Sequence, residues 1–390
     1  MDLAVARWLV SAEAQPWLAA AEQEVDPSSL AAATRMRRDL AAPRAAAVLE
    51  QAALRQRGQA KLGRRDLFLT SAGLEQASRP AVTRWRAERL AAAGARRVWD
   101  LGCGLGLDTV ALVDAGLAVV AVEQDPVTAV LAQANLVHVG WSGQVRVIDA
   151  AEVIGQIPAT DAVFADPARR TGRGRSWDPA DLSPPLQVLR PLLHHGRLAC
   201  IKLGPGVPHA MVPDETETIW VSDHHDLVEA SLWGGLGVRR SALLLPGGQQ
   251  LDAGPDCEVH ELGRYLYEPD PAVIRAGAVG SLARQLGAGR VASRIAYLTS
   301  HYPAETDLAT RFEILERLPW RESQLRSWVR KHQIGSLEIK KRGIETDPAA
   351  LRRRLRPNGP RQATWVITPT PGAAAVLVVR RTDLGSERPA

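Results

Sequence analysis

Cysteine and long apolar runs are both scarce in this chain of 390 residues. Its three cysteines form no Cys-x-x-Cys pair, so the sequence supports neither a disulfide framework nor a zinc-cysteine cluster. No run of about eighteen uncharged apolar residues is present, as a membrane span requires, and Asp2, Arg7 and Glu13 interrupt the N-terminal stretch. We therefore expect a soluble, unexported protein of the reducing cytoplasm that does not contact a membrane.

Lysine is rare as well, because only five of the 48 basic residues are lysine. The formal net charge is only +5, and an excess this small over the whole chain says little about binding to nucleic acid. The distribution is uneven, however. The stretch from Arg311 to Arg361 contains fourteen basic and six acidic residues, a local net charge of +8.

The length of the chain predicts two or three domains, and the hydrophobic pattern divides it into four segments. Residues 1–94 have apolar positions three and four apart, which predicts an N-terminal helical region. Residues 95–254 alternate short β-branched runs with helical stretches, which predicts an α/β domain with a parallel sheet. Residues 255–310 read as a linker and helical connection, and residues 311–390 as a small basic α+β domain.

Three alternate glycines follow a predicted buried strand in the sequence VWDLGCGLGLDTV. Gly102, Gly104 and Gly106 stand between a strand and a helix start, where glycine permits a left-handed backbone and close approach of a ligand. Asp100 precedes them, giving D-x-G-x-G-x-G instead of the G-x-G-x-x-G of dinucleotide sites. A carboxylate here would repel a diphosphate and attract the ammonium group of a methionine moiety. The loop therefore favours a cationic cofactor without phosphate.

Two further acids end the next two predicted strands. Glu123 lies where a carboxylate can accept hydrogen bonds from both hydroxyl groups of a ribose. Asp149 lies where it could accept one from an adenine amino group. Either acid alone is equally well explained as a turn residue. Their occurrence in order after the glycine loop favours an adenosine-containing cofactor.

Taken in order, DLGCGLG, VEQDP, IDA and FADPARR resemble the class I S-adenosylmethionine-dependent methyltransferases over about residues 96–248. The resemblance implies a Rossmann-like sheet of seven strands with a reversed last strand, and S-adenosyl-L-methionine as cofactor. It implies that the methionine part is held by Asp100, Gly102, Cys103, Gly104 and Gly106. Glu123 would hold the ribose, and the adenine would be bordered by Gln124, Asp149 and Ala150.

A narrower resemblance spans both halves of the chain. FADPARRTGRGR, IKLGPGVP, YLYEPDPAVIRAG and LEIKKRG followed by DPAALRRRL resemble a bacterial methyltransferase family with a C-terminal THUMP-like domain. THUMP domains are RNA-binding modules attached to RNA-modifying enzymes, so this resemblance implies RNA as substrate and partner.

The fourth predicted strand of the sheet ends in Asp166 and Pro167. Methyl transfer requires alignment of the acceptor atom and a group that receives a proton, and Asp166 can orient or deprotonate an attacking nitrogen. Many methyltransferases that act on nucleic-acid amino groups carry D/N-P-P-Y/F here, with an aromatic ring that stacks on the base. Ala168 and Arg169 replace the last two residues, which puts methylation of an exocyclic amine in doubt. The candidate catalytic residues are Asp166, Pro167 and Arg169.

Basic and aromatic side chains after this strand and near the C-terminus are candidates for contact with RNA. Guanidinium groups can contact phosphates or stack on bases, although a solvated loop or helix face explains the same residues. For Lys202, at the end of a predicted strand, a structural role explains the residue nearly as well as substrate binding does. The predicted substrate-binding residues are Arg170, Arg173, Arg175, Trp177, Lys202, Lys340, Lys341 and Arg342.

Histidine occurs in two adjacent pairs, His194 with His195 and His224 with His225. Neither pair has a third donor at ligand spacing, so no metal site is predicted.

The leading hypothesis is an S-adenosylmethionine-dependent methyltransferase that acts on a base of tRNA or rRNA. A second hypothesis keeps the enzyme but gives it a small molecule or a protein as substrate. A third is a catalytically inactive RNA-binding protein with a methyltransferase fold. Retained Asp100 and Glu123 argue against the third hypothesis, and the missing aromatic residue after Pro167 argues for it.

Overall fold

The computed structural model describes residues 1–169, 181–194 and 196–382. The chain forms two compact units. The first consists of Met1–Thr218 and Val228–Val238, and the second of Ile219–Leu227 and Arg239–Ala390. The finer division into four segments stays a prediction.

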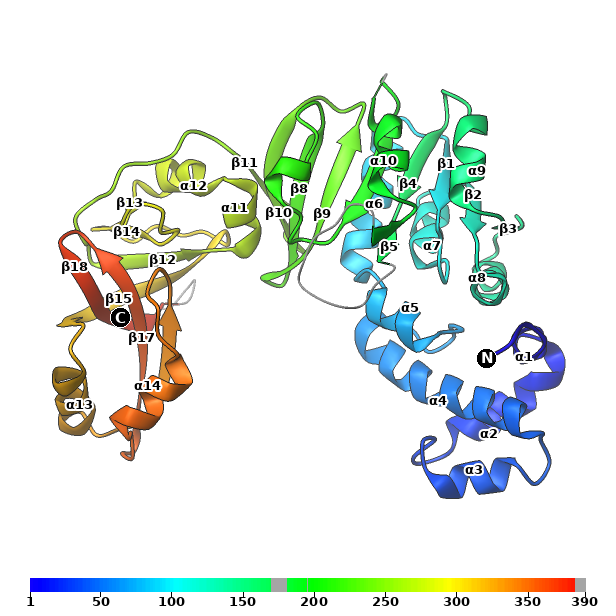
Figure 1. The fold of residues 1–390 in the computed structure, drawn as a ribbon, viewed down its shortest axis with the longest axis horizontal. Coiled ribbons are helices and arrows are strands. Elements are labelled where there is room, and N and C mark those ends of the chain that lie inside the picture. Colours follow the sequence, from blue (N-terminus) through cyan, green and yellow to red (C-terminus); the bar gives the residue numbers. More distant parts are fainter. Residues whose placement is uncertain (170–180, 195, 383–390) are drawn as a thin grey trace, which may run out of the picture. The chain divides into compact units, whose positions relative to one another are not determined.

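The first unit begins with six α-helices, which confirms the predicted N-terminal helical region (Figure 1). They are α1 (Leu3–Leu9), α2 (Gln15–Glu22), α3 (Leu30–Met36), α4 (Ala42–Leu62), α5 (Ser71–Gln76) and α6 (Pro80–Ala92). Side-chain caps start several of them: Asp2 accepts a hydrogen bond from Val5 N, and Thr70 accepts one from Gly73 N. The left-handed Gly63 ends α4.

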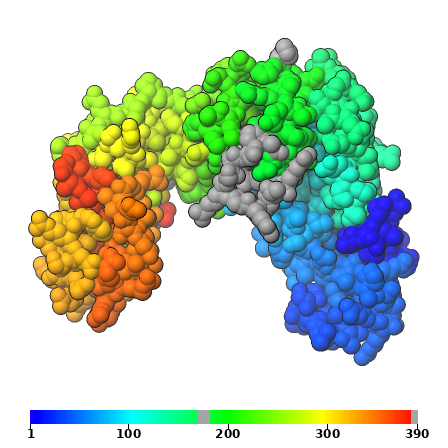
Figure 2. All heavy atoms as spheres, viewed as in Figure 1, coloured from blue at the N-terminus to red at the C-terminus, as the bar shows by residue number. Residues whose placement is uncertain are grey.

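The helices share one apolar core with the glycine loop. Leu105 of that loop and Leu131 of α8 (Pro126–His138) pack with the leucines and alanines of α1 to α5. Buried Asn135 of α8 accepts a hydrogen bond from Phe68 N and donates to Phe68 O and Leu105 O. Figure 2 shows atoms of α1 against those of α8. The N-terminal helices are thus anchored beside the loop.

A twisted sheet forms the centre of the first unit. Its strands lie in the order β9-β7-β4-β1-β2-β3, and all pairs from β7 to β3 are parallel. The strands are β1 (Arg97–Leu101), β2 (Ala118–Glu123), β3 (Arg146–Val147), β4 (Ala162–Ala165), β7 (Ala199–Leu203) and β9 (Asp226–Gly234). Strand β9 runs antiparallel to β7. This arrangement confirms the predicted Rossmann-like methyltransferase sheet and contains a reversed strand, while the predicted number of seven strands stays a prediction.

Short connections carry the chain between these strands. They include α7 (Leu107–Asp114), α8, α9 (Ala150–Val153), α10 (Leu186–Leu189) and a two-stranded sheet of β5 (Ala168–Arg169) and β6 (Leu182–Ser183). Because β1, β2 and β4 are parallel neighbours, their carboxyl ends meet at one edge, and the residues that follow them come together there.

The second unit contains the C-terminal α+β domain that the sequence predicts. Its seven-stranded sheet has the order β13-β14-β12-β15-β18-β17-β16. These strands are β12 (Tyr265–Pro269), β13 (Gly289–Arg290), β14 (Leu298–Ser300), β15 (Ala309–Pro319), β16 (Ile334–Lys341), β17 (Arg361–Thr370) and β18 (Ala373–Arg381). The second unit also contains most of β8 (Glu217–Asp223), together with β10 (Arg239–Leu245), β11 (Gln249–Asp252), α11 (Pro271–Ala276) and α12 (Val279–Leu286).

Apolar clusters cover the sheet of the second unit. Side chains of α13 (Glu322–Lys331) and α14 (Pro348–Leu355) pack with Trp365 and Val376 of the sheet. A further cluster joins Leu266 and Tyr297 to Leu377. The region expected as a linker and helical connection therefore contributes strands β12, β13 and β14 to this sheet. Turn residues and prolines around Pro269 concealed these short strands in the sequence.

Candidate functional site

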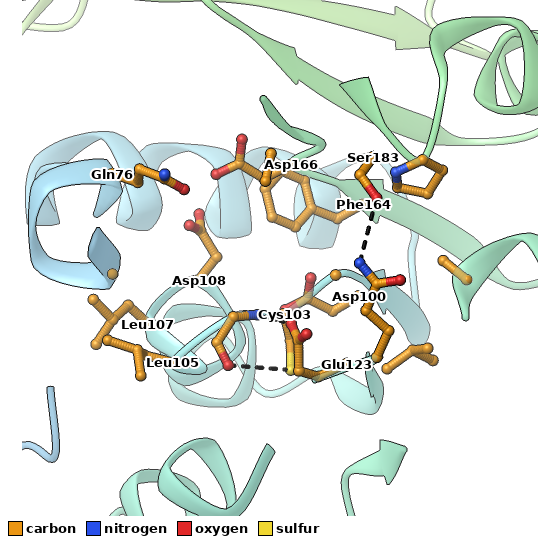
Figure 3. Close-up of a pocket in the computed structure, with 18 of the residues that line it drawn as sticks. Gln76, Asp100, Cys103, Leu105, Leu107, Asp108, Glu123, Phe164, Asp166 and Ser183 are labelled. Atoms are coloured by element: carbon orange, nitrogen blue, oxygen red, sulfur yellow. Dashed lines mark hydrogen bonds between the residues drawn. The ribbon is translucent and has the colours of Figure 1, made fainter. Parts of the chain in front are cut away.

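A cavity lies at the carboxyl edge of β1, β2 and β4 (Figure 3). It is lined by nine residues that the sequence predicts for the cofactor or for catalysis: Asp100, Gly102, Cys103, Gly104, Glu123, Gln124, Asp149, Ala150 and Asp166. Five acidic side chains are among the lining residues, those of Asp100, Asp108, Glu123, Asp149 and Asp166. No lysine, arginine or histidine of the described residues lines the cavity. The wall therefore suits a ligand with positive charge.

The glycine loop presents bare backbone to this cavity. Gly102 and Gly104 have φ angles of +79° and +55°, and a Cβ atom at either position would meet no protein atom within 4 Å. The left-handed backbone, not packing against the protein, is thus what requires glycine. Gly106, with φ +78°, caps α7 behind the cavity wall. Burial raises the pKa of the Cys103 thiol well above its usual value, so this cysteine is a small packed group.

Asp100 is fully buried at the base of the cavity. Its Oδ2 accepts a hydrogen bond of 2.5 Å from Thr109 Oγ1, and its Oδ1 has no partner among the described residues. Burial raises the pKa of this carboxyl to about 8, against the opposing effect of the Thr109 hydroxyl, and the nearby charges of Asp108 and Asp166 add to the rise. An unpaired buried acceptor of this kind calls for a donor from a ligand.

Glu123 joins the end of β2 to the glycine loop. Its Oε2 accepts a hydrogen bond of 3.0 Å from Gly104 N, and its Oε1 accepts one of 2.9 Å from Asp125 N. Burial raises the pKa of the carboxyl, while these backbone donors oppose the rise. Each oxygen keeps a second lone pair, so the carboxylate can still accept from two hydroxyl groups.

The next residues along the edge form a more polar wall. Asp149 caps α9 by accepting a hydrogen bond of 2.8 Å from Ala151 N. Gln124 donates one of 3.3 Å to Ser183 Oγ, which also lines the cavity. The sequence alone does not indicate Ser183, since it lies 59 residues from Gln124 in the chain.

Asp166 lies at the opposite side of the cavity from Glu123 (Figure 3). Its Oδ2 is 2.6 Å from Nζ of Lys202, a predicted substrate-binding residue at the end of β7 that does not itself line the cavity. Burial lowers the pKa of Lys202, but the carboxylates of Asp166, Asp108 and Glu229 outweigh it and raise the pKa. Lys202 therefore stays charged and holds one oxygen of Asp166.

The other predicted residues of the first unit lie apart from this wall. Pro167 is buried and does not line the cavity, and the backbone of Arg169 pairs with Leu182 in the small sheet. Four predicted substrate-binding residues lie outside the described residues: Arg170, Arg173, Arg175 and Trp177.

Two of the three adjacent basic residues Lys340, Lys341 and Arg342 already contact other side chains of the second unit. Lys340 Nζ is 2.8 Å from Glu268 Oε2, and Arg342 lies over the ring of Tyr297 at 5.4 Å. Lys341 is exposed, as are the arginines that follow it on α14. Exposed positive charge therefore lies at Lys341, at Arg353 on α14, and at Arg356, which follows the end of that helix.

Sequence reasoning missed Asp108 and the buried arginine behind it. Arg86 of α6 pairs with both Asp108 and Glu229 and is 1% exposed. An acidic residue in the first turn of a helix is common because it interacts favourably with the helix dipole, so Asp108 does not stand out. Arg86, Asp108 and Glu229 also lie far apart in the sequence. No local signal distinguishes them.

No group of three potential metal-binding side chains occurs within residues 1–169, 181–194 and 196–382. In the same described ranges, no helix has the length and apolar character that crossing a bilayer demands.

Comparison with known proteins identifies the family. Two uncharacterized S-adenosylmethionine-dependent methyltransferases, from two strains of Mycobacterium tuberculosis, are each 35% identical to this chain over 344 residues. The alignment covers 83% of this chain and 93% of each relative. This chain belongs to the S-adenosylmethionine-dependent methyltransferases.

Other similarities cover particular parts of the methyltransferase. Residues 309–381 match the THUMP domain-like family, which confirms the resemblance seen in the sequence. Residues 2–58 match a domain of unknown function. A candidate methyltransferase of Porphyromonas gingivalis W83 shares the fold over 98% of both chains, with a TM-score of 0.78 and 22% identity.

The cavity of the methyltransferase fits its cofactor. Asp100 Oδ1 is a buried acceptor in need of a donor, the glycine loop offers bare backbone, and five carboxylates face a ligand that carries two positive groups. When bound, S-adenosylmethionine supplies an electrophilic methyl group on a positively charged sulfur.

Proposed function

We propose that this methyltransferase modifies a base of RNA, with tRNA and rRNA as the substrate classes. The observation that carries the proposal is the presence, in one chain, of a methyl-donor cavity and a basic THUMP-like domain. A phosphate backbone fits the local net charge of +8 between Arg311 and Arg361.

In this proposal each set of predicted cofactor residues binds a different part of S-adenosylmethionine. The ammonium group of the methionine part lies against Asp100 and the loop of Gly102, Cys103, Gly104 and Gly106. Glu123 accepts from the ribose hydroxyls, and the adenine lies beside Gln124, Asp149 and Ala150. The support is that all of these residues except Gly106 line one cavity.

Asp166 is the proposed catalytic group at the acceptor side. Lys202 binds its Oδ2, so Oδ1 is left to orient an N–H of the acceptor base or to receive its proton. Pro167 and Arg169 follow Asp166 in the sequence and come just before Arg170, Arg173, Arg175 and Trp177, for which base stacking and phosphate contact are expected. Ala168 cannot stack on a base, so the stacking ring comes from elsewhere in the chain.

The THUMP-like domain is proposed to bind the RNA backbone. Of the residues first expected to do so, Lys341 is exposed, whereas Lys340 and Arg342 already contact Glu268 and Tyr297. Phosphate binding therefore depends chiefly on Lys341 and on the arginines of α14.

The experiment is a comparison of modified nucleosides by mass spectrometry, using tRNA and rRNA from a strain without this gene. We expect one methylated nucleoside to disappear and to return with the wild-type gene but not with an Asp166→Ala gene. An unchanged nucleoside profile in both RNA classes would contradict an RNA substrate and favour a small molecule or a protein.

A further inference from the structure

Asp108, in the first turn of α7, forms part of the cavity wall and is held from behind by a buried cation. Its Oδ1 is bound by Nη1 of Arg86, while its Oδ2 has no partner among the described residues. The side chain is 13% exposed. Figure 3 shows its carboxylate on the same side of the cavity as Gln76 and Asp166.

Arg86 is fixed on several sides. Both oxygens of Glu229, on β9, accept from its Nη2 at 2.8 and 2.7 Å, and its guanidinium lies 4.6 Å from the ring centre of Phe164. Burial lowers the pKa of Arg86, but the carboxylates of Glu229 and Asp108 outweigh it, so the arginine stays charged. Its geometry leaves Asp108 little freedom to turn.

The charges in this group do not balance. Arg86 neutralises only one of its two carboxylate partners, and Glu229 already uses both oxygens on it. Lys202, the neighbouring cation, pairs with Asp166 instead. One negative charge is therefore in excess, and Asp108 is the member of the group that faces the cavity. In a poorly solvated wall such an excess attracts a cationic ligand.

Two orphaned polar atoms lie in the same wall. Asp100 Oδ1 and the hydroxyl of Ser78, which is 9% exposed, are buried without a hydrogen-bond partner among the described residues. A ligand that brings both donors and an acceptor would satisfy them. An α-amino-acid group does so, since its ammonium has three N–H donors and its carboxylate accepts.

We propose that Asp108 binds the ammonium group at the amino-acid end of S-adenosylmethionine, beside Asp100, and that Arg86 and Glu229 are positioning residues that keep its charge facing the cavity. This assigns helix α6, through Arg86, a part in holding the methyl donor. The inference rests on the cofactor and does not depend on the RNA substrate.

The experiment measures ligand binding to the full-length protein by calorimetry. S-adenosylhomocysteine carries the amino-acid end, whereas 5′-methylthioadenosine lacks it. Asp108→Asn should weaken binding of S-adenosylhomocysteine by about 10- to 100-fold, as expected for a lost hydrogen bond between charged groups. Binding of 5′-methylthioadenosine should change by less than about twofold, because this ligand offers Asp108 nothing to bind.

Variants of Glu229 test the positioning role. In Glu229→Gln, Asp108 is the one charged partner left to Arg86, so the excess negative charge is removed and binding of S-adenosylhomocysteine should fall about tenfold. Glu229→Asp keeps the second carboxylate and should therefore retain most of the wild-type affinity. The matched control is Glu217→Gln, because Glu217 pairs with Arg89 on the same helix but does not line the cavity. This control should bind both ligands as the wild type does.

Unchanged binding of S-adenosylhomocysteine by Asp108→Asn would overturn the inference, and so would an equal loss for both ligands, which indicates general damage to the cavity. If the wild-type protein bound neither ligand, the cofactor site itself would be wrong. An RNA substrate that fails in other tests would leave these binding results intact.

Discussion

Replacing Asp100 with asparagine should stabilise the ligand-free protein at pH 8 and remove most of its affinity for S-adenosylmethionine. The carboxyl is fully buried, and burial raises its pKa from 3.8 to about 8. The charges that act on it are those of Asp108 and Asp166, which add to the rise, and of Arg86, which opposes it. The side chain is therefore costly to the fold without its ligand.

The direction of the pH effect follows from proton binding. In the folded chain Asp100 keeps its proton up to about pH 8, whereas in the unfolded chain it releases the proton near pH 4. The unfolded chain then binds fewer protons between these values, so this group lowers the stability as the pH rises through that window. Asparagine has no proton to release. The variant should gain about 2–4 kcal/mol over the wild type at pH 8, and much less at pH 5.

Chemical denaturation at pH 5, 6.5 and 8 measures this difference. Asp149→Asn serves as control, because Asp149 lines the same cavity without being buried. The difference in unfolding free energy between this variant and the wild type should not increase from pH 5 to pH 8. Stability curves of Asp100→Asn and wild type that stay parallel from pH 5 to pH 8 would contradict an acid held neutral by burial.

The same substitution should weaken S-adenosylmethionine binding by about 100-fold at pH 8, since the lost carboxylate is a buried, charge-assisted partner. For the wild type, binding below pH 8 should release a proton as the ammonium group approaches Asp100. Calorimetry in two buffers that differ in ionisation enthalpy counts that proton, and Asp100→Asn should release none from this position. Full affinity in Asp100→Asn would remove Asp100 from the donor site.

Reversing two charges on the C-terminal domain should separate RNA binding from binding of the methyl donor. Arg353 and Arg356 are exposed at the end of α14, and no acidic residue lies within three positions of either in the sequence. The double variant Arg353→Glu with Arg356→Glu should weaken RNA binding by about 10- to 100-fold near 0.1 M salt. The slope of log K against the logarithm of the salt concentration should also become shallower by about 1.5 to 2.

Arg37→Glu with Arg38→Glu is the matched control for this experiment. It makes the same change in net charge, and both arginines are exposed on the first unit, outside the THUMP-like domain. The control should keep the salt dependence of the wild type, and both double variants should bind S-adenosylhomocysteine normally. An equal loss of RNA binding in the two double variants would show that only the total charge matters, not α14.

The residues that line this cavity could be predicted to lie together because they obey a local rule. Asp100, Glu123 and Asp166 each lie at or beside the end of a short apolar strand, and parallel neighbouring strands bring such positions to one edge. The alternate glycines add a backbone requirement that is visible in the sequence, since each adopts a positive φ. Chain order and strand period are enough to place all of them.

The buried ion pairs and the short strand β12 could not be predicted, because they depend on contacts between residues far apart in the sequence. Arg86 and Glu229 are 143 residues apart, and an arginine on a predicted helix is normally a surface residue. Lys340 resembles a phosphate ligand by its neighbours in sequence, yet its partner Glu268 lies 72 residues earlier on β12. That strand has only five residues and ends in a proline, so its place in the sheet is decided by pairing with β15.

We propose that the methyltransferase uses this cavity to transfer methyl groups to RNA, and a labelling experiment tests that transfer. Purified full-length protein should be incubated with S-adenosylmethionine labelled in its methyl group and with total RNA from a strain without the gene. We expect label in one RNA nucleoside with the wild type and none with Asp166→Ala, although that variant should still bind S-adenosylhomocysteine. Label that enters protein or small molecules while RNA stays unlabelled would contradict it.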